Sequence, residues 1–143
     1  NPERTAKAIK NGWFYSGDLA RTDDEGYLYI VDRKKDIIIS GGENVSAREV
    51  EEAFYTHPAV FKAAVFGLPH SKWGEQVTAA VVLAKDQDVT SGQLSEYLKK
   101  RVAGYKIPRS IHFLNALPES GVGKISKTKL KEMFTPDNVQ QEM

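Results

Sequence analysis

The sequence predicts an α+β fold, in which helices pack on a small mixed sheet that a β-hairpin-like segment precedes. Two segments combine the spacing of a capping box with an apolar stripe of helical period, so each is expected to form a helix. Short apolar runs rich in β-branched and aromatic residues lie around them and indicate strands. The resulting order is hairpin, helix, strand, strand, helix, strand, helix, which favours α+β.

The chain opens with a polar stretch, of which residues 5–10 are typical of the last part of a helix. The next segment, residues 12–18, is aromatic and bounded by glycines, and we expect a short strand and a turn there. Residues 23–26 are acidic and end in glycine, which predicts a polar turn.

A pair of strands is expected on either side of a charged connection. Tyr27–Val31 is rich in β-forming residues and Ile37–Ile39 is a second apolar run, with the charged residues 33–36 between them. We expect these two runs to form the hairpin-like unit, and Gly41 and Gly42 to end it.

The first helix is expected to begin after Ser46. Ser46 and Glu49 have capping-box spacing, so the hydroxyl can accept from the Glu49 amide while the Glu49 carboxylate reaches back. Pro58 is expected to stop the helix. The residues at helical spacing predict its buried face, which consists of Val50, Ala53, Phe54 and His57.

Two strands are expected to follow this helix. Val60–Phe66 is apolar apart from one lysine and is predicted to be a central strand, and Gln76–Leu83 is rich in valine and alanine. The residues between them, 67–74, are expected to form a loop.

A second capping box, Thr90 and Gln93, predicts a second helix that closes near Gly104. Its buried stripe is expected to consist of Leu94, Tyr97, Leu98 and Val102. The remaining elements are predicted to be a strand at Ile111–Leu114, a loop at 118–123, a short basic helix at Lys127–Phe134 and a frayed polar tail at 136–143.

The composition is that of an ordinary globular protein. The 143 residues are 41% hydrophobic and 27% charged, a balance that can bury a core. A formal net charge of +1 gives no overall field that would point to nucleic acid, and no apolar run approaches the roughly 20 residues of a membrane helix. The lack of cysteine excludes thiolate chemistry and fits a reducing compartment, so we expect a cytoplasmic protein. Because the chain starts without Met, we expect more protein upstream.

One loop carries a candidate anion site. Lys124 follows two glycines in the loop 119–126, where the backbone can approach a ligand closely and the lysine supplies a point charge. The P-loop pattern fails, because it would need glycine in place of Pro118 and Ser or Thr in place of Ile125. From this pattern alone, a flexible surface turn is the favoured interpretation.

Two other loops have suggestive residues, although local chemistry again favours ordinary turns. Gly41 and Gly42 follow an apolar run, which indicates unusual backbone angles or a close approach by another backbone or a ligand. Asp18 follows a glycine and could accept hydrogen bonds from the vicinal hydroxyls of a ribose. No metal site is expected, because the histidines lie far apart without ligand spacing: His57, His70 and His112.

These signals are weak individually, but they occur in a distinctive order and spacing. The series consists of Trp13-Phe14-Tyr15-Ser16-Gly17-Asp18, Gly26-Tyr27-Leu28, residues 32–45 (Asp-Arg-Lys-Lys-Asp-Ile-Ile-Ile-Ser-Gly-Gly-Glu-Asn-Val), Glu49-Val50-Glu51, Tyr105-Lys106-Ile107-Pro108, Leu117-Pro118 and Gly123-Lys124-Ile125. It closely resembles the end of the adenylate-forming enzymes, a superfamily that includes acyl-CoA synthetases, peptide-synthetase adenylation domains and beetle luciferases. The resemblance covers nearly the whole chain except its termini, and it favours an acyl-CoA synthetase similar to fatty-acid–CoA ligases.

The resemblance implies a division of the chain and a reaction. Residues 1–32 would be the last stretch of an N-terminal adenylation domain, residues 33–36 a hinge, and residues 37–135 a mobile C-terminal lid. A carboxylic acid and ATP would give acyl-AMP and pyrophosphate, and the CoA thiol would then attack acyl-AMP to give the thioester and AMP. ATP with Mg²⁺ would be bound mainly by the N-terminal domain of the same enzyme, so this chain alone is expected to be inactive.

The resemblance also implies roles for residues near the nucleotide. Asp18 matches the aspartate that binds the ribose hydroxyls, and Arg33 matches an arginine just before the hinge that contacts the nucleotide. Lys124 matches the catalytic lysine that bridges the acyl carboxylate and the α-phosphate. Two departures from the common pattern are mild, namely Ser16 for threonine and Lys127 for arginine.

Further roles concern the second half-reaction. Lys35 stands at the hinge position, which is often aspartate and sometimes lysine in the superfamily. Gly41, Gly42 and Glu43 lie in the loop that would swing inward to help form the channel for the pantetheine arm of CoA.

Two other functions stay open. Another adenylate-forming enzyme, such as a peptide-synthetase adenylation domain or a luciferase, would use a different acceptor, so exchanging CoA for a carrier protein would discriminate. A free-standing binding module without catalysis would bind ATP or CoA tightly by itself. A lid that holds only part of a site should bind them more weakly than about millimolar.

Overall fold

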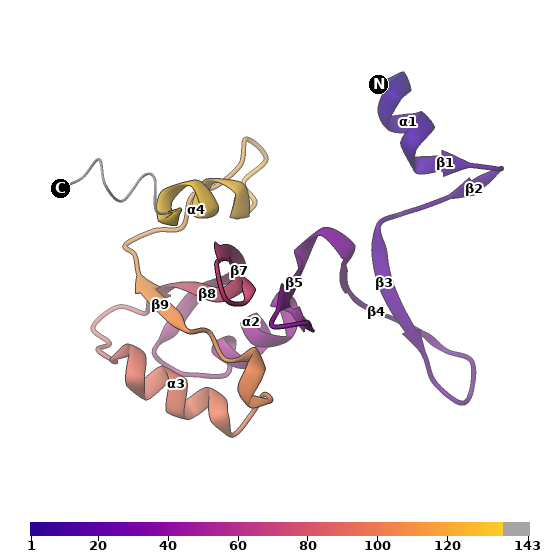
Figure 1. The fold of residues 1–143 in the computed structure, drawn as a ribbon. Helices are drawn as coiled ribbons and strands as arrows, with labels where there is room; N and C mark the ends of the chain where they lie inside the picture. Colours follow the sequence, from indigo (N-terminus) through magenta and orange to yellow (C-terminus); the bar gives the residue numbers. More distant parts are fainter. Residues whose placement is uncertain (136–143) are drawn as a thin grey trace.

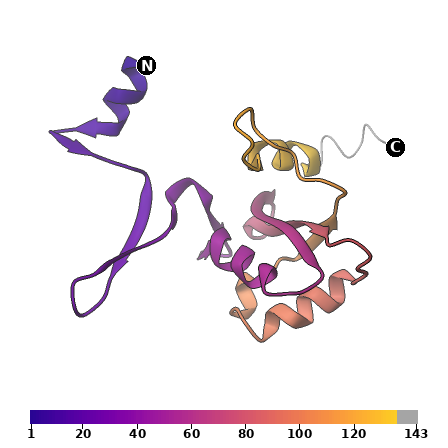
Figure 2. The same ribbon diagram turned by 180° about the vertical axis from the view of Figure 1, so that it is seen from behind.

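The computed structural model describes residues 1–135, and the predicted frayed tail at 136–143 lies outside the described residues. An N-terminal segment, residues 1–33 (the arm), reaches away from a layered part formed by residues 37–135 (the body). Figures 1 and 2 show these two parts from opposite sides, with the N-terminus near the far end of the arm.

The arm is built from two antiparallel strand pairs, β1–β2 and β3–β4. The polar turn predicted at 23–26 closes the second pair, because the Asp23 carboxylate accepts hydrogen bonds from the amides of Glu25 and Tyr27, both at 3.0 Å. The elements of the arm are α1 (Pro2–Ala8), β1 (Ile9–Lys10), β2 (Trp13–Phe14), β3 (Asp18–Thr22) and β4 (Leu28–Arg33). α1 therefore ends at Ala8, earlier than the predicted end at residue 10, and Ile9 and Lys10 form the short strand β1.

The body contains one mixed five-stranded sheet with the order β6-β5-β8-β7, and β9 pairs with β8. The β8–β9 pair is parallel and the others are antiparallel, which confirms the predicted α+β class with a small mixed sheet. The elements of the body and of the connection before it are η1 (Lys34–Asp36), β5 (Ile37–Ser40), β6 (Glu43–Ser46), α2 (Ala47–Tyr55), β7 (Val60–His70), β8 (Gly74–Leu83), α3 (Ser91–Lys99), η2 (Gly104–Lys106), β9 (Ser110–Phe113) and α4 (Lys127–Phe134).

Both faces of the sheet are covered by helices. Ala63, Val65 and Val81 point to the face on which α2 and α3 pack, with Phe54, Leu94 and Leu98 in the same apolar cluster. The alternate residues of the two strands point to the other face, where α4 packs with Leu130, and they are Ala64, Phe66, Leu68, Ala80 and Val82. Because side chains alternate between faces, strands buried on both sides become nearly continuous apolar runs.

The strands of the predicted hairpin do not pair with each other, and each pairs with a different strand. β4, which contains most of Tyr27–Val31, pairs with Asp18–Thr22, whereas β5, which contains Ile37–Ile39, pairs with β6. The 3₁₀ turn at Lys34–Asp36 separates two hairpins and does not join one. Gly41 and Gly42 accordingly form the turn of the second hairpin, with φ of 59° and 82° that suit glycine.

β7 is longer than predicted and lies at the end of the sheet order. Val60–Phe66 was expected to be a central strand, but β8 has neighbours on both sides, and within residues 1–135 β7 pairs only with β8. Residues 67–70 extend the strand instead of forming a loop, and Pro69 is tolerated there because an edge strand has one side free of ladder bonds.

The predicted helix starts are confirmed, with one difference. Thr90 and Gln93 form the complete capping box of α3. At α2 the Ser46 hydroxyl accepts from the Glu49 amide at 3.2 Å, as expected. The Glu49 carboxylate does not complete the box, because it accepts two hydrogen bonds from Lys106 Nζ, at 3.0 and 2.8 Å.

Candidate functional site

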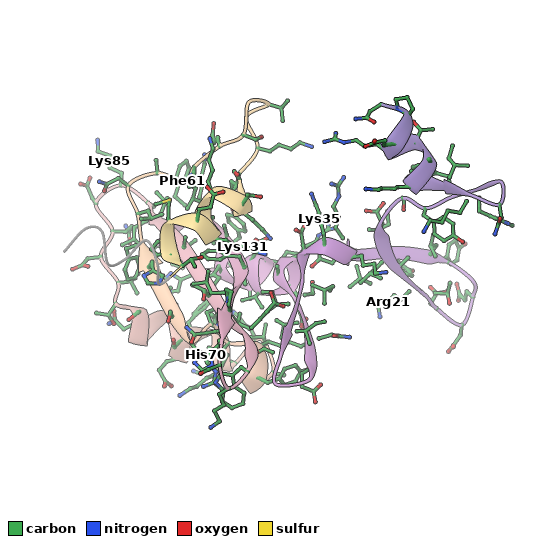
Figure 3. All side chains as sticks on the ribbon, turned by 45° about the horizontal axis from the view of Figure 1, so that its top comes forward. Arg21, Lys35, Phe61, His70, Lys85 and Lys131 are labelled. Atoms are coloured by element: carbon green, nitrogen blue, oxygen red, sulfur yellow. The ribbon has the colours of Figure 1, made fainter. Side chains whose placement is uncertain are left out.

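An open cavity of about 550 Å³ lies where the arm joins the body, between the connection after β4 and the N-terminal end of α4. Three of the predicted site residues, Arg33, Lys35 and Lys124, meet there although they come from opposite ends of the chain. Figure 3 shows Lys35 at the junction of arm and body, and Lys131 on α4. The full lining consists of Arg33, Lys35, Asp36, Lys124, Ile125, Ser126, Lys127, Thr128 and Lys131.

The cavity is strongly cationic. Among residues 1–135, its lining has five basic side chains and one carboxylate, that of Asp36. The first residues of α4 also belong to the lining, and the N-terminal end of a helix carries partial positive charge. This arrangement favours an anion with several oxygens, such as a phosphate or a carboxylate, over a metal ion.

Lys124 projects from a tight loop before α4. The ends of the loop are held by a bridge between Glu119 and Ile125, and the Ser120 amide donates to the Lys124 carbonyl at 2.7 Å. Gly123 has φ of 76°, so glycine lets the chain turn immediately before the lysine. Lys124 is exposed, and its Nζ makes no hydrogen bond or ion pair with residues 1–135.

Two other lysines near the loop, Lys127 and Lys129, are engaged. Lys127 Nζ lies 2.9 Å from Glu51 Oε1, and this same oxygen accepts from the Val65 amide at 2.9 Å. Lys129 Nζ donates to the Glu119 carbonyl at 2.9 Å. These contacts fasten α4 and the loop to α2 and to each other. Sequence reasoning gave Lys127 and Lys131 no role at the site, because nothing in the sequence reveals what each lysine contacts.

Asp18 lies beside the cavity, next to Arg33. The two residues face each other in the β3–β4 register, and Arg33 Nε is 3.8 Å from Asp18 Oδ1. The Lys34 amide donates to the Gly17 carbonyl at 2.8 Å, which keeps the start of the connection against this part of the arm. Asp18 does not line the cavity itself. Arg33 lines the cavity together with Lys124 and also contacts Asp18, so it connects Asp18 to the lysine loop.

The glycine loop forms a second region. None of Gly41, Gly42 and Glu43 lines the cationic cavity. Gly41 instead lies against Trp73: its amide donates to the Trp73 carbonyl at 2.9 Å, and a Cβ atom at Gly41 would lie 3.0 Å from Trp73 Cε3. The predicted close approach by another backbone is therefore that of Trp73, and its indole, which was not predicted, lies there as well.

Trp73 is flanked by two cations that sequence reasoning missed. The Arg109 guanidinium carbon lies 4.2 Å from the centre of the indole ring, and Lys72 Nζ lies 4.7 Å from it. Such positions are typical of cation–π contacts. The two positive charges at this indole favour a negatively charged group next to the glycine loop.

None of the helices formed by residues 1–135 combines the length and apolarity that a membrane span requires.

Comparisons with known proteins show which family the chain belongs to. Residues 49–124 match the family model for the AMP-binding enzyme C-terminal domain. The chain is 49% identical over 134 residues to the long-chain-fatty-acid–CoA ligase FadD13 of Mycobacterium tuberculosis. The match covers 94% of this chain and 26% of that protein. It is 46% identical over 133 residues to a feruloyl-CoA synthase of Amycolatopsis, and this match covers 93% of this chain and 27% of that protein.

A solved structure gives the same result in three dimensions. MatB from Rhodopseudomonas palustris with ATP bound is 36% identical and superposes with a TM-score of 0.84, over 96% of this chain and 27% of that one. The apo form of MatB, at the same identity and the same coverage of this chain, gives 0.76. This chain spans about a quarter of the length of the proteins that it matches. It belongs to the family of AMP-binding enzyme C-terminal domains.

Proposed function

We propose that the chain is the mobile C-terminal domain, or lid, of an AMP-forming acyl-CoA synthetase. The whole enzyme would form acyl-AMP from a carboxylic acid and ATP, and then the acyl-CoA thioester. The observation that carries this proposal is the exposed Lys124, which has no side-chain partner among residues 1–135 and lines one cationic cavity with Arg33 of the arm.

The first half-reaction explains why a free lysine is needed. Adenylation brings a carboxylate to the α-phosphate of ATP, and these two anions repel each other. A cation between them offsets the repulsion and stabilises the charge that develops on the transferring centre. Lys124 can act in this way because no partner in the described part holds its ammonium group. Its role is electrostatic, since a carboxylate already ionised at neutral pH needs no general base.

Arg33 and Asp18 would hold the nucleotide beside this lysine. The Asp18 carboxylate can accept from the vicinal hydroxyls of the ribose, and Arg33 can donate to the nucleotide from the adjacent strand. Mg²⁺ would enter bound to ATP. The cationic lining does not suit a metal ion, so we expect its protein ligands in the N-terminal domain, outside this chain.

The second half-reaction would use the region around Gly41. The absence of side chains at Gly41 and Gly42 lets a long, narrow acceptor pass close to the backbone. Trp73 and Arg109 beside this loop could bind the charged, planar end of CoA. Because the two half-reactions would use different residues of the lid, we propose that it reorients about the connection 33–36, with Lys35 at the pivot.

The names of similar proteins favour CoA as the acceptor over a carrier protein. FadD13 is named for long-chain fatty acids and the Amycolatopsis protein for feruloyl-CoA, so the acids differ among relatives. Fatty acids are the first substrates to test. ATP and CoA are intracellular reactants, and a cytoplasmic location is part of the same proposal.

The test uses the whole enzyme that contains this chain. We expect pyrophosphate release with ATP and a suitable acid, followed by thioester formation when CoA is added but not when a carrier protein replaces it. Pyrophosphate release with transfer only to a carrier protein would support a peptide-synthetase-like enzyme instead. Tight binding of ATP or CoA by the 143-residue chain alone would contradict the assignment as a lid.

A further inference from the structure

Asp32 is a buried carboxylate that the proposed chemistry does not use. It is 6% exposed, and the other buried polar side chains of residues 1–135 are Ser46 and Thr78. Asp32 lies near the end of β4, immediately before Arg33, and its register partner in the arm is Leu19. The residues before it are exposed, apart from the half-buried Ala8, so burial begins at the point where the arm meets the body.

The Asp32 carboxylate joins the arm to the first turn of α2. Asp32 Oδ2 accepts from the Ser46 hydroxyl at 2.7 Å and from the Arg48 amide at 3.2 Å. Asp32 Oδ1 accepts from the Arg33 amide at 2.7 Å. A negative charge at the N-terminal end of a helix is favourable, and hydrogen bonds to a charged acceptor are stronger than neutral ones.

The helix does not need this second acceptor in order to begin. Ser46 already caps α2 through the Glu49 amide, at 3.2 Å. α3 begins with an equivalent cap at Thr90, whose hydroxyl accepts from the Gln93 amide at 3.1 Å, and no acidic residue lies in its first turn. The carboxylate from the arm therefore adds a connection between two parts of the molecule that the cap alone does not provide.

Rotation of the body about residues 33–36 would break this connection. Asp32 is fixed on the arm side by the β3–β4 pairing, whereas Ser46 and Arg48 move with the body. In the orientation with the connection intact, Arg33 and Lys124 line one cavity. The chain superposes on ATP-bound MatB with a TM-score of 0.84 and on apo MatB with a TM-score of 0.76.

We propose that Asp32 is a positioning residue that holds the lid in the orientation for acyl-AMP formation and releases it for thioester formation. The inference rests on the proposed function. Asp32 acts through the Ser46 hydroxyl and the Arg48 amide and touches no reactant itself.

The test compares Asp32→Asn with Thr90→Ala in the whole enzyme. Asparagine keeps the size of the side chain but removes the charge, and we expect acyl-AMP formation to fall about tenfold relative to thioester formation from supplied acyl-AMP. Thr90→Ala removes a helix cap of the same kind at α3, away from the junction, so it should leave the ratio of the two half-reactions unchanged.

A second pair of variants guards against a simple loss of folding. Ser46→Ala removes the donor and should shift the ratio in the same direction as Asp32→Asn, whereas Ser46→Thr keeps a hydroxyl and should restore it. In the Asp32→Asn background, Ser46→Ala should add little to the shift in ratio, because both act on one contact.

Hydrogen exchange of the amides in residues 33–36 gives a readout that does not depend on activity. We expect faster exchange in Asp32→Asn and in Ser46→Ala, and unchanged exchange in Thr90→Ala. If Asp32→Asn lowered both half-reactions equally and left this exchange unchanged, the positioning role would be wrong. An enzyme without any adenylation activity would contradict the proposed function, while the exchange data would still test the connection.

Discussion

The lysines around α4 look alike in the sequence but differ in what they contact. Lys127 is bound to Glu51 and Lys129 to the Glu119 carbonyl, whereas Lys124 is exposed and unpaired within the described residues. A cation already held by a carboxylate is less available to an anionic ligand, so of these three lysines Lys124 is the most available. The resemblance selected Lys124 from the sequence, and its exposed place in the cationic cavity supports the role proposed for it.

Gly41 offers a prediction for the second half-reaction. Alanine there would be strained at φ of 59°, and its Cβ would lie 3.0 Å from Trp73 Cε3. We expect Gly41→Ala to slow thioester formation and to cost about 1–2 kcal/mol of unfolding free energy. Gly104 has an ordinary φ and open space around it, so Gly104→Ala is the control. Equal effects of the two variants on thioester formation would argue against a role for this loop.

His112 gives the stability of the chain a pH dependence. Its ring stacks on Phe134, with ring centroids 4.2 Å apart, and burial lowers the pKa of His112 below the ordinary 6.5. Below about pH 6.5 the unfolded state binds a proton that the folded state does not, so stability falls as the pH drops from 6.5 toward the folded pKa. Urea unfolding at several pH values should show this fall, and His112→Gln should reduce it. An unchanged pH dependence in that variant would contradict the role of His112.

At the scale of elements, α4 positions the lysine loop by packing. Leu130 is fully buried between α4 and the sheet, whereas Met133 on the same helix is 46% exposed. We expect Leu130→Ala to lower the free energy of unfolding by about 2–5 kcal/mol, because it leaves a cavity under the helix. Met133→Ala should change it by less than about 1 kcal/mol. Urea unfolding of the two variants measures both values, and similar losses would show that α4 is not anchored through Leu130.

The local signals for helices were reliable because each lies within a few residues. Ser46 and Thr90 cap their helices as predicted, and the buried stripe with Leu94 and Leu98 is confirmed. Strand pairing was predicted less well, because it depends on distant partners. β3 is exposed along its whole length and carries no apolar run, so the sequence did not reveal it as the partner of β4.

The site was predictable only in part, for the same reason. The motif order pointed to Arg33, Lys35 and Lys124, which the structure brings to one cavity. Trp73 and Arg109 were not found, because their contact joins the loop before β8 to the residue before β9 and no local spacing predicts it. The signal that reveals Trp73 and Arg109 is spatial. An indole with two cations close to its ring lies beside the paired glycines.

The molecule as a whole has an unequal distribution of apolar surface. The arm exposes large apolar side chains along its length, among them Trp13 at 73%, Phe14 at 71% and Leu28 at 68%. The body buries most of its apolar side chains between the helices and the sheet, and its exposed ones, such as Phe61 at 61% and Val122 at 80%, are scattered along the chain. Exposed apolar surface of this extent marks an interaction site. We therefore expect the arm to pack against the N-terminal domain of the whole enzyme.

Hydrogen exchange can test this packing. In the 143-residue chain alone, the amides of residues 9–31 should exchange faster than in the whole enzyme, where the N-terminal domain would cover them. The amides of β7 and β8 should be protected in both, because the core of the body is complete within this chain. Equal exchange of the arm in the two proteins would show that it does not pack on the rest of the enzyme.

The central claim is that Lys124 serves acyl-AMP formation, and separate assays of the two half-reactions in the whole enzyme test it most directly. We predict that Lys124→Ala slows acyl-AMP formation by about 10²–10³-fold and leaves thioester formation from supplied acyl-AMP nearly unchanged. Lys85, an exposed lysine that Figure 3 shows on the body, provides the control, and Lys85→Ala should affect neither half-reaction. Equal losses in both half-reactions of Lys124→Ala, or none in either, would contradict the account.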